Sequence, residues 1–300
     1  MPGLIRKGEC NSPPPDPPEP TGIPADSESN RLLFGSPGEW IGTAAFALAI
    51  LLALADPRLA TVPLAAFLIL CLAAPFAPGF GFFMPVVRRG NSGKRAVALT
   101  FDDGPDPETT PILLDLLERR GVRAAFFVTG KHAESHPELI REILDRGHEI
   151  GNHTHGHDNL VMLRPSHVLR REIDRTQRIL ARFGIVPRAF RPPVGIVSPR
   201  LPHVLRGTEI FVVHFGRRAG DAGNRRVRGM ARRLLRGVRP DDILLLHDIR
   251  PPDPSRLPVW IREVERLLSG LERRGIAVLP LSALIGRPTM DRSESATTPT

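Results

Sequence analysis

Two adjacent carboxylates follow an apolar run and precede a glycine–proline pair. The segment "RAVALTFDDGP" places Asp102 and Asp103 directly before Gly104 and Pro105. Neighbouring side chains on a strand point to opposite faces, so both carboxylates can serve one site only if the backbone turns there. Gly and Pro permit such a turn. A plain surface turn explains the segment equally well on its own, and the rest of the chain has to decide between the two interpretations.

A second cluster, "HTHGH" at residues 153–157, holds three histidines within five residues. A surface loop with a histidine bias is one interpretation. The other is that His153 and His157 bind a metal together, because imidazole suits Zn²⁺ and similar ions. A catalytic zinc has three protein ligands, and the aspartate pair can supply the third while its other carboxylate serves as a base. Adjacent carboxylates would then provide a ligand and a base from one strand end.

Polar residues also follow two later apolar segments, with Arg191 in "RPPVG" and His247 in "LLLHD". From residue 95 to residue 286, short apolar strands alternate with amphipathic helices, which predicts a parallel α/β sheet or barrel. Active sites in such folds collect at the C-terminal ends of the strands. Each polar cluster comes where a predicted strand stops, so we expect one shared site.

The four segments "TFDDGP", "HTHGH", "RPPVG" and "LLLHD", in this order and at these separations, resemble the motifs of the polysaccharide deacetylase family, carbohydrate esterase family four. The resemblance covers residues 95–286. It implies an incomplete, TIM-like (β/α) barrel and a divalent metal, usually zinc. It also implies a role for each matching position. Asp102 would be the general base, held in place by Arg191, and His247 the general acid. The metal ligands would be Asp103, His153 and His157, and the Val194 N–H would bind the oxyanion.

The chain departs from the family pattern at two positions. Val194 stands where the third motif normally has an aromatic residue, which reduces the stacking surface for a sugar ring. In the fourth motif, Asp221 lacks the usual following tryptophan, and it is the candidate to tune His247. With 5% aromatic residues and no tyrosine, a long cleft of stacking rings is not expected. A small or lipid-linked sugar fits better.

The resemblance implies metal-assisted hydrolysis of a non-peptide amide. The expected substrate is an N-acetylated amino sugar in a glycan, an oligosaccharide or a lipid-linked precursor. A formyl group is equally compatible with the motifs, and deacylation of a non-sugar amide is an alternative. A degenerate barrel that binds a glycan or lipid without catalysis is the rival from another class of protein. The intact motif residues argue against it.

The N-terminal third predicts a tail and a membrane hairpin. Residues 1–38 are proline-rich and polar, which is typical of a disordered segment. Two uncharged runs follow, Trp40–Ala55 with 16 residues and Leu59–Phe83 with 25 residues. A bilayer core needs about 20 apolar residues in a helix, so residues 39–84 are predicted as two transmembrane or re-entrant helices. A buried soluble hairpin and a signal peptide are the alternatives. The last segment, 287–300, is predicted to be disordered.

Localisation follows from the predicted hairpin and the distribution of charge. We expect a membrane of the bacterial inner-membrane type, with both ends of the hairpin in the cytoplasm according to the positive-inside bias. If only one run spans, the globular part lies outside. The net charge of +9 and nine arginines between residues 217 and 239 predict a solvated helix face or contact with anionic lipid. No recognition motif predicts nucleic-acid binding. The oligomeric state is not predictable from these features.

Overall fold

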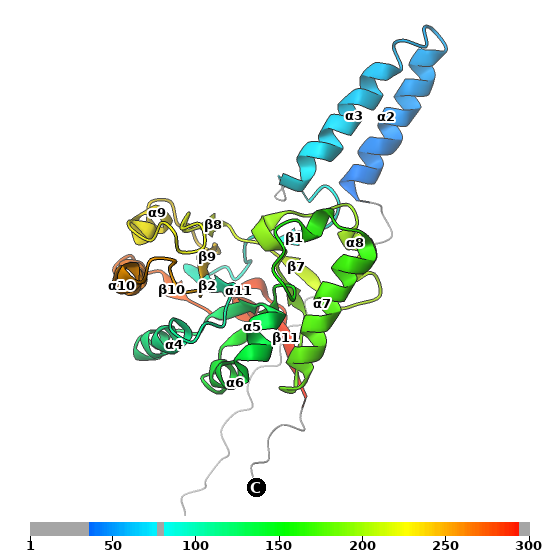
Figure 1. Ribbon diagram of the computed structural model, residues 1–300. Helices are drawn as coiled ribbons and strands as arrows, with labels where there is room; N and C mark the ends of the chain where they lie inside the picture. The colour runs from blue at the N-terminus through cyan, green and yellow to red at the C-terminus, as the bar shows by residue number, and fades with distance from the viewer. Residues whose placement is uncertain (1–35, 77–80, 294–300) are drawn as a thin grey trace, which may run out of the picture. The chain divides into compact units, whose positions relative to one another are not determined.

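The structure, a computed structural model, describes residues 36–76 and 81–293. Its main feature is a curled sheet of parallel strands surrounded by helices (Figure 1). Along the sheet the strand order is β1-β7-β6-β4-β3-β2-β9-β8, and β10 pairs with the start of β2. The two edge strands, β1 and β8, are not paired with each other within the described residues. The prediction of an incomplete (β/α) barrel is therefore confirmed.

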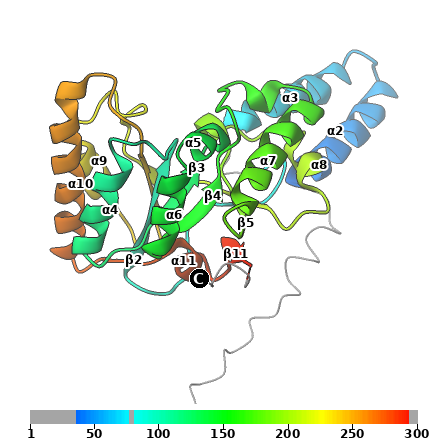
Figure 2. The ribbon, with the colours of Figure 1, turned by 60° about the horizontal axis from the view of Figure 1, so that its bottom comes forward.

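The strands of this sheet are short: β1 Val86–Val87, β2 Ala96–Asp102, β3 Ala125–Val128, β4 Glu149–Asn152, β6 Ala189–Phe190, β7 Phe211–Val213, β8 Arg217–Arg218, β9 Ile243–His247 and β10 Ala277–Val278. The helices around it are α4 Thr110–Arg119, α5 Gly130–Ser135, α6 Pro137–Asp145, α7 Ser166–Ala181, α8 Leu201–Leu205, α9 Met230–Leu235, α10 Leu257–Glu272 and α11 Leu281–Ile285. Figure 2 shows α4 and α10 lying side by side outside the strands.

The side chains of strand β2 alternate between the outer core and the barrel interior. Val97, Leu99 and Phe101 pack into the core between the sheet and the outer helices. The alternate residues face the barrel interior, where Ala98 belongs to a second core cluster. Because side chains alternate along a strand, Asp102 points into the barrel at the carboxyl end of β2.

Helix α11 covers the opposite end of the barrel. Leu281 and Leu284 pack against residues at the starts of strands, among them Ala96 of β2 and Ile243 of β9. Apolar side chains therefore close the amino-terminal end of the barrel. The polar groups that follow the strands lie at the other end, as in other parallel α/β folds.

The N-terminal apolar runs form a helical hairpin, α2 Pro37–Ala53 and α3 Thr61–Ala73, in which the rings of Phe46 and Phe67 contact each other. None of the helices in the described part of the chain combines the length and the apolar character that a membrane span requires. The prediction of two transmembrane helices is therefore not supported. In the second run the α-helix ends at Ala73, and the chain continues as a 3₁₀ turn that contains Pro75. Thirteen helical residues span only about 20 Å.

Both predicted tails need correction where the structure describes them. Helix α2 begins at Pro37 with Ser36 as its cap, inside the segment expected to be disordered, and residues 1–35 lie outside the described residues. At the other end, β11 (Met290–Arg292) pairs antiparallel with β5 (Ile185–Pro187). The prediction of a disordered segment from residue 287 is therefore wrong up to residue 293, and residues 294–300 are not described.

Candidate active site

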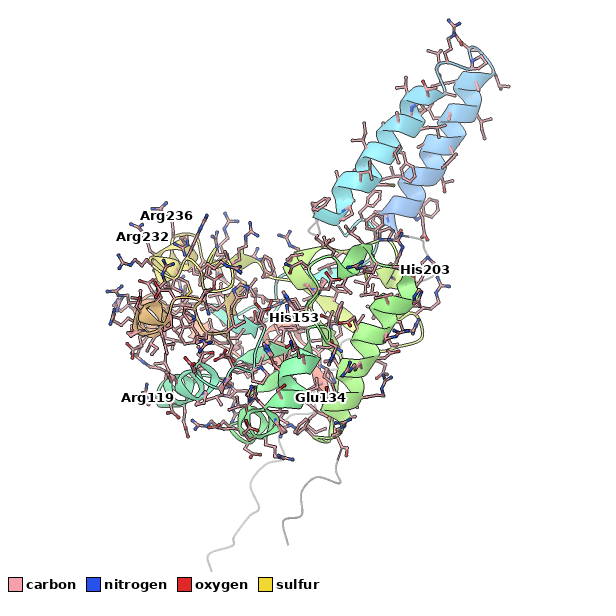
Figure 3. All side chains as sticks on the ribbon, viewed as in Figure 1. Arg119, Glu134, His153, His203, Arg232 and Arg236 are labelled. Atoms are coloured by element: carbon pink, nitrogen blue, oxygen red, sulfur yellow. The ribbon has the colours of Figure 1, made fainter. Side chains whose placement is uncertain are left out.

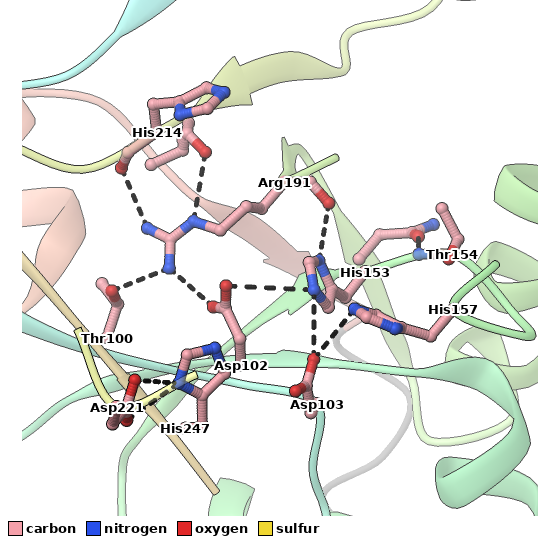
Figure 4. Close-up of polar contacts among 12 residues, drawn as sticks. Thr100, Asp102, Asp103, His153, Thr154, His157, Arg191, His214, Asp221 and His247 are labelled. Atoms are coloured by element: carbon pink, nitrogen blue, oxygen red, sulfur yellow. Dashed lines mark hydrogen bonds and ion pairs between the residues drawn. The ribbon is translucent and has the colours of Figure 1, made fainter. Parts of the chain in front are cut away.

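The ends of five strands bring the predicted residues together at one end of the barrel (Figure 4). Asp102 ends β2 and His247 ends β9, and the two are register partners on neighbouring strands. Asp103 follows β2, His153 and His157 follow β4, Arg191 follows β6 and Asp221 follows β8. These residues and Val194 line a groove of about 780 Å³. The structure thus brings together every site residue that the sequence analysis named.

Arg191 holds the Asp102 carboxylate from inside the barrel. Its Nη1 donates to Asp102 Oδ1 at 2.6 Å, and only 1% of the arginine and 4% of the aspartate are exposed. The same guanidinium donates to Thr100 Oγ1 and to the carbonyl oxygens of Val213 and His214. These hydrogen bonds fix the plane of the guanidinium, which in turn holds Asp102 through Oδ1. The other oxygen, Oδ2, remains on the side of His153, 3.9 Å from its Nε2.

The turn after β2 brings Asp103 to the same site. Asp103 has a φ of 76°, in the left-handed region that non-glycine residues rarely adopt. This turn replaces the alternation of a strand, so both carboxylates face one site. Gly104 is required next, because a Cβ there would lie 2.7 Å from Asp248 Oδ2. Asp248 is buried, and it accepts hydrogen bonds from the hydroxyls of Thr109 and Thr110 on the other side of the turn.

Asp103, His153 and His157 have the geometry of a metal site. Asp103 Oδ1 lies 3.4 Å from His153 Nε2 and 3.1 Å from His157 Nε2, and the three ligand atoms lie within 4.8 Å of one another. His153 Nδ1 lies 2.7 Å from the carbonyl oxygen of Arg191. A carbonyl only accepts, so in the neutral imidazole Nδ1 carries the proton and Nε2 presents a lone pair to the carboxylate.

The lone pairs of His153 Nε2 and Asp103 Oδ1 face each other, and a cation between them would remove their repulsion. Asp103 Oδ1 is buried and accepts no well-formed hydrogen bond from the described residues. A carboxylate and two imidazoles are ligands that Zn²⁺ commonly takes, with a further position left for water or substrate. The hydrogen bond from His153 Nδ1 to a backbone carbonyl orients the ring in the way usual for metal-binding histidines. The residues present therefore fit a divalent metal.

The loop that carries the two histidines is held by residues the sequence analysis did not find. Thr154 and His157 both have positive φ, 65° and 52°, so the chain reverses within the motif. Asn152 Oδ1 accepts from the Thr154 N–H at 2.9 Å. Glu172 of α7 accepts from the N–H groups of His155 and Gly156, at 3.1 and 2.7 Å. Nothing in the sequence near residue 172 signals this contact.

His247 is held by Asp221 on the other wall of the groove. His247 Nδ1 lies 2.9 Å from each of the two Asp221 carboxylate oxygens. Burial alone would lower the pKa of His247, but the hydrogen bond and the charge of Asp221 raise this pKa to about 9. His247 is therefore protonated at neutral pH and can donate a proton. The Asp221 carboxylate lies where the sequence analysis placed it, without a tryptophan beside it.

The remaining predicted residue is Val194, which lies at the rim of the groove. The residue is 56% exposed and its φ is 49°, an uncommon conformation for a β-branched residue. The sequence-based role for its N–H group at an oxyanion stays a prediction. His214, which the sequence analysis did not place in the site, is buried behind Arg191, and burial lowers its pKa to about 3.

Comparison with known proteins agrees with this geometry. A family model described as polysaccharide deacetylase matches residues 89–212. A chitooligosaccharide deacetylase of Bradyrhizobium is 34% identical over 201 residues, which cover 64% of this chain and 92% of that protein. A peptidoglycan-N-acetylglucosamine deacetylase of Bacillus cereus is 46% identical over 107 residues, 35% of this chain and 38% of that protein.

A solved structure shows the same fold. The crystal structure of the Bc1960 peptidoglycan N-acetylglucosamine deacetylase superposes with a TM-score of 0.63 at 29% identity. The match covers 72% of this chain and 98% of that chain. Sequence, fold and the arrangement of groups around the groove agree, and the chain therefore belongs to the polysaccharide deacetylase family and is an enzyme of the deacetylase type.

Proposed function

We propose that the chain removes the N-acetyl group from an amino sugar of an oligosaccharide or glycan by hydrolysis of the amide bond. One observation carries the proposal. A buried carboxylate, Asp102, and a protonated imidazole, His247, are register partners that flank one groove, with the Asp103, His153 and His157 set beside them. Relatives that act on chitooligosaccharides and on peptidoglycan N-acetylglucosamine support the choice of an N-acetylated sugar.

A divalent metal, most readily zinc, would be held by Asp103, His153 and His157, and when bound it supplies Lewis-acid polarisation of the acyl oxygen. The chain's own residues perform the proton transfers. Asp102 takes a proton from the water that attacks the acyl carbon, and Arg191 holds this carboxylate in its orientation. His247 gives its proton to the amide nitrogen as the C–N bond breaks. Water is consumed, and the products are acetate and a free amine.

The burial of Asp102 and Arg191 matters for this chemistry. Three hydrogen bonds to oxygen atoms other than those of Asp102 fix the guanidinium in the protein interior. The base therefore needs little reorganisation when the reaction begins, which is a main source of catalytic power in preorganised sites. Because Oδ2 lies on the same side as His153, it is the carboxylate oxygen placed to accept the proton from the attacking water.

The test is to supply the full-length chain with zinc and with N-acetylated, N-formylated and O-acetylated sugars of the same length. Acetate and the newly formed amine are measured together. Equal amounts of acetate and amine from the N-acetylated sugar support the proposal. Faster release of formate from the N-formylated sugar would change the proposed acyl group to formyl. Faster release of acetate from the O-acetylated sugar would change the proposed bond from an amide to an ester. No release from any substrate while zinc stays bound would favour a barrel that binds without hydrolysis.

A further inference from the structure

Three exposed arginines line the groove without a carboxylate partner. Arg218 ends β8, and Arg225 and Arg226 lie in the loop before α9. Within the described residues their guanidinium groups form no hydrogen bond and no ion pair. The other arginines of the groove are different, because Arg191 is bound to Asp102 and Arg250 is bound to Glu108.

The acidic groups of the groove are already engaged. Asp102 is bound by Arg191, and Asp221 is bound by His247. Asp103 faces the two histidines of the metal site, which would hold its charge. No carboxylate lining the groove in the described structure is left to neutralise Arg218, Arg225 or Arg226. This wall of the groove therefore carries an excess of positive charge.

The loop that carries two of these arginines is attached to the strand end of the general acid. Asn224 Nδ2 donates to the carbonyl oxygen of His247 at 3.0 Å and to that of Ile249 at 2.6 Å. The N–H of Arg226 donates to the carbonyl oxygen of Asp221 at 2.8 Å. Arg225 and Arg226 follow Asn224 directly, so these bonds fix their backbone beside His247. Both residues thus line the side of the groove where the leaving nitrogen would be protonated.

Features that would bind a neutral sugar ring are scarce in the same groove. At the rim of the groove, Val194 offers an aliphatic side chain and no ring. Among the described residues that line the groove, Phe215 is the one phenyl ring, and no tryptophan is present. Stacking on aromatic faces therefore contributes little here, whereas guanidinium groups are well supplied.

We propose that the arginine wall, defined as Arg218, Arg225 and Arg226, binds an anionic group that the substrate carries next to its N-acylated sugar. Guanidinium groups recognise phosphate and carboxylate oxygens by paired, charge-assisted hydrogen bonds. The anion is therefore a phosphate or a carboxylate attached to the saccharide. The inference rests on the proposed function, because the wall is placed relative to the amide that Asp102 and His247 would hydrolyse.

The experiment compares matched substrates with the zinc-loaded, full-length chain. Methyl N-acetylglucosaminide is the neutral probe. N-acetylglucosamine 1-phosphate, a prenyl phosphodiester of the same sugar, and a disaccharide containing N-acetylmuramic acid test a free phosphate, a lipid-linked phosphate and a carboxylate. We expect at least one anionic probe to exceed the neutral probe about tenfold or more in kcat/KM. High ionic strength reduces this preference.

Two triple variants distinguish binding of the anion by the arginine wall from an effect of the protein's total charge. The groove variant combines Arg218→Gln, Arg225→Gln and Arg226→Gln. The control variant combines Arg119→Gln, Arg232→Gln and Arg236→Gln, three exposed arginines outside the active-site groove (Figure 3). Both lose three positive charges. The preference is measured as the ratio of kcat/KM for the anionic probe to kcat/KM for the neutral probe. This ratio should fall about tenfold in the groove variant and stay at the wild-type value in the control.

Two results would overturn the inference while the proposed function stands: a wild-type enzyme that hydrolyses the neutral probe as well as every anionic probe, or a groove variant that keeps the preference. If no probe is hydrolysed, the proposed function fails, and calorimetric binding of N-acetylglucosamine 1-phosphate then tests the wall by itself. Binding that is lost in the groove variant and retained in the control supports the arginine wall. Equal binding by all three proteins contradicts it.

Discussion

Asp102 and His247 lie opposite each other on neighbouring parallel strands, at the last residue of each strand. Register partners on parallel strands point to the same face of a sheet, so the proposed base and acid both face the barrel interior. Their partners come from elsewhere in the chain, Arg191 from the end of β6 and Asp221 from the loop after β8. The pairing of β2 with β9 therefore sets the distance between the two proton-transfer groups.

Replacement of Arg191 should damage both stability and catalysis. Arg191→Ala leaves the buried Asp102 carboxylate without its partner, and we expect the free energy of unfolding to fall by about 3–5 kcal/mol. Arg191→Lys keeps the charge but loses the fork that bonds Thr100, Val213 and Asp102 together. We expect this variant to fold and to lose most of its kcat. Urea unfolding and steady-state kinetics measure the two effects.

The matched control for Arg191 is Arg188→Lys, because Arg188 is a partly exposed arginine three residues earlier that pairs with Asp291 and Glu209. Ion pairs of this kind contribute about 1 kcal/mol or less, so Arg188→Lys should resemble the wild type. Wild-type kcat in Arg191→Lys would show that the orientation of Asp102 does not matter.

Asp221 should set the alkaline limit of the proposed reaction. Burial opposes the charge on His247, but Asp221 raises the pKa of His247 to about 9. In Asp221→Asn the burial remains while the charge is lost, so this pKa should fall below its ordinary value of about 6.5. The kcat/KM of the wild type should decline as pH rises through about 9, and that of the variant should already decline below pH 7. Identical alkaline limbs in the two pH profiles would refute the role of Asp221.

The same pair links stability to pH. Because the pKa of His247 is higher in the folded chain than in the unfolded chain, its contribution to stability is fully present below about pH 6.5. This contribution is lost as pH rises through about 9. Urea unfolding of wild type and Asp221→Asn at several pH values should therefore converge at high pH. If the difference in unfolding free energy between wild type and Asp221→Asn instead grew with pH, the stabilising role assigned to protonated His247 would be wrong.

Zinc should stabilise the fold through Asp103, His153 and His157. A ligand present at 100 times its Kd stabilises the folded state by about 2.7 kcal/mol, and the Tm should rise accordingly. His153→Ala removes one ligand atom and should abolish this rise. His167→Ala, an exposed histidine of α7, is the control and should keep it. A rise in Tm that survives in His153→Ala would place the metal elsewhere.

Glu172 should control how tightly the metal is held. Its carboxylate accepts from two consecutive N–H groups in the loop between the two histidine ligands. Glu172→Ala removes both bonds, and we expect zinc affinity to fall about tenfold or more, as for other residues that support metal ligands. Competition with a chelator of known affinity measures the change. Glu265→Ala on α10 serves as the control, and an unchanged affinity in Glu172→Ala would assign the carboxylate a purely structural role.

The sequence was sufficient to predict the barrel and the residues at its open end. Each apolar strand stops where a chemically capable residue begins, so Asp102, His153, Arg191 and His247 could be found from local patterns. The residues that hold them in place could not. Glu172 is one of several polar residues on an amphipathic helix, and only the three-dimensional packing of α7 against the histidine loop reveals its contact.

The ends of helices and strands were predicted less well than their presence. The helix face predicted from the arginines between residues 217 and 239 is limited to α9, Met230–Leu235, because Gly229 takes a left-handed φ of 73° at its start. The length of the uncharged run from residue 59 to residue 83 led to the prediction of a membrane helix, although proline and glycine near the end of the run disfavour a helix there. Strand β11 was missed because its pairing with β5 depends on chain distant in sequence.

The central claim is that Asp102 acts as the base in amide hydrolysis, and one measurement tests it most directly. Acetate release from an N-acetylglucosamine oligomer is measured with zinc-loaded wild type, Asp102→Asn and Asp145→Asn, the last being an exposed aspartate of α6. Bound zinc is quantified in each sample. The account predicts release by the wild type and by Asp145→Asn, and a loss of about 10²-fold or more in Asp102→Asn with zinc still bound. Equal release by all three proteins, or no release by a zinc-loaded wild type, would contradict it.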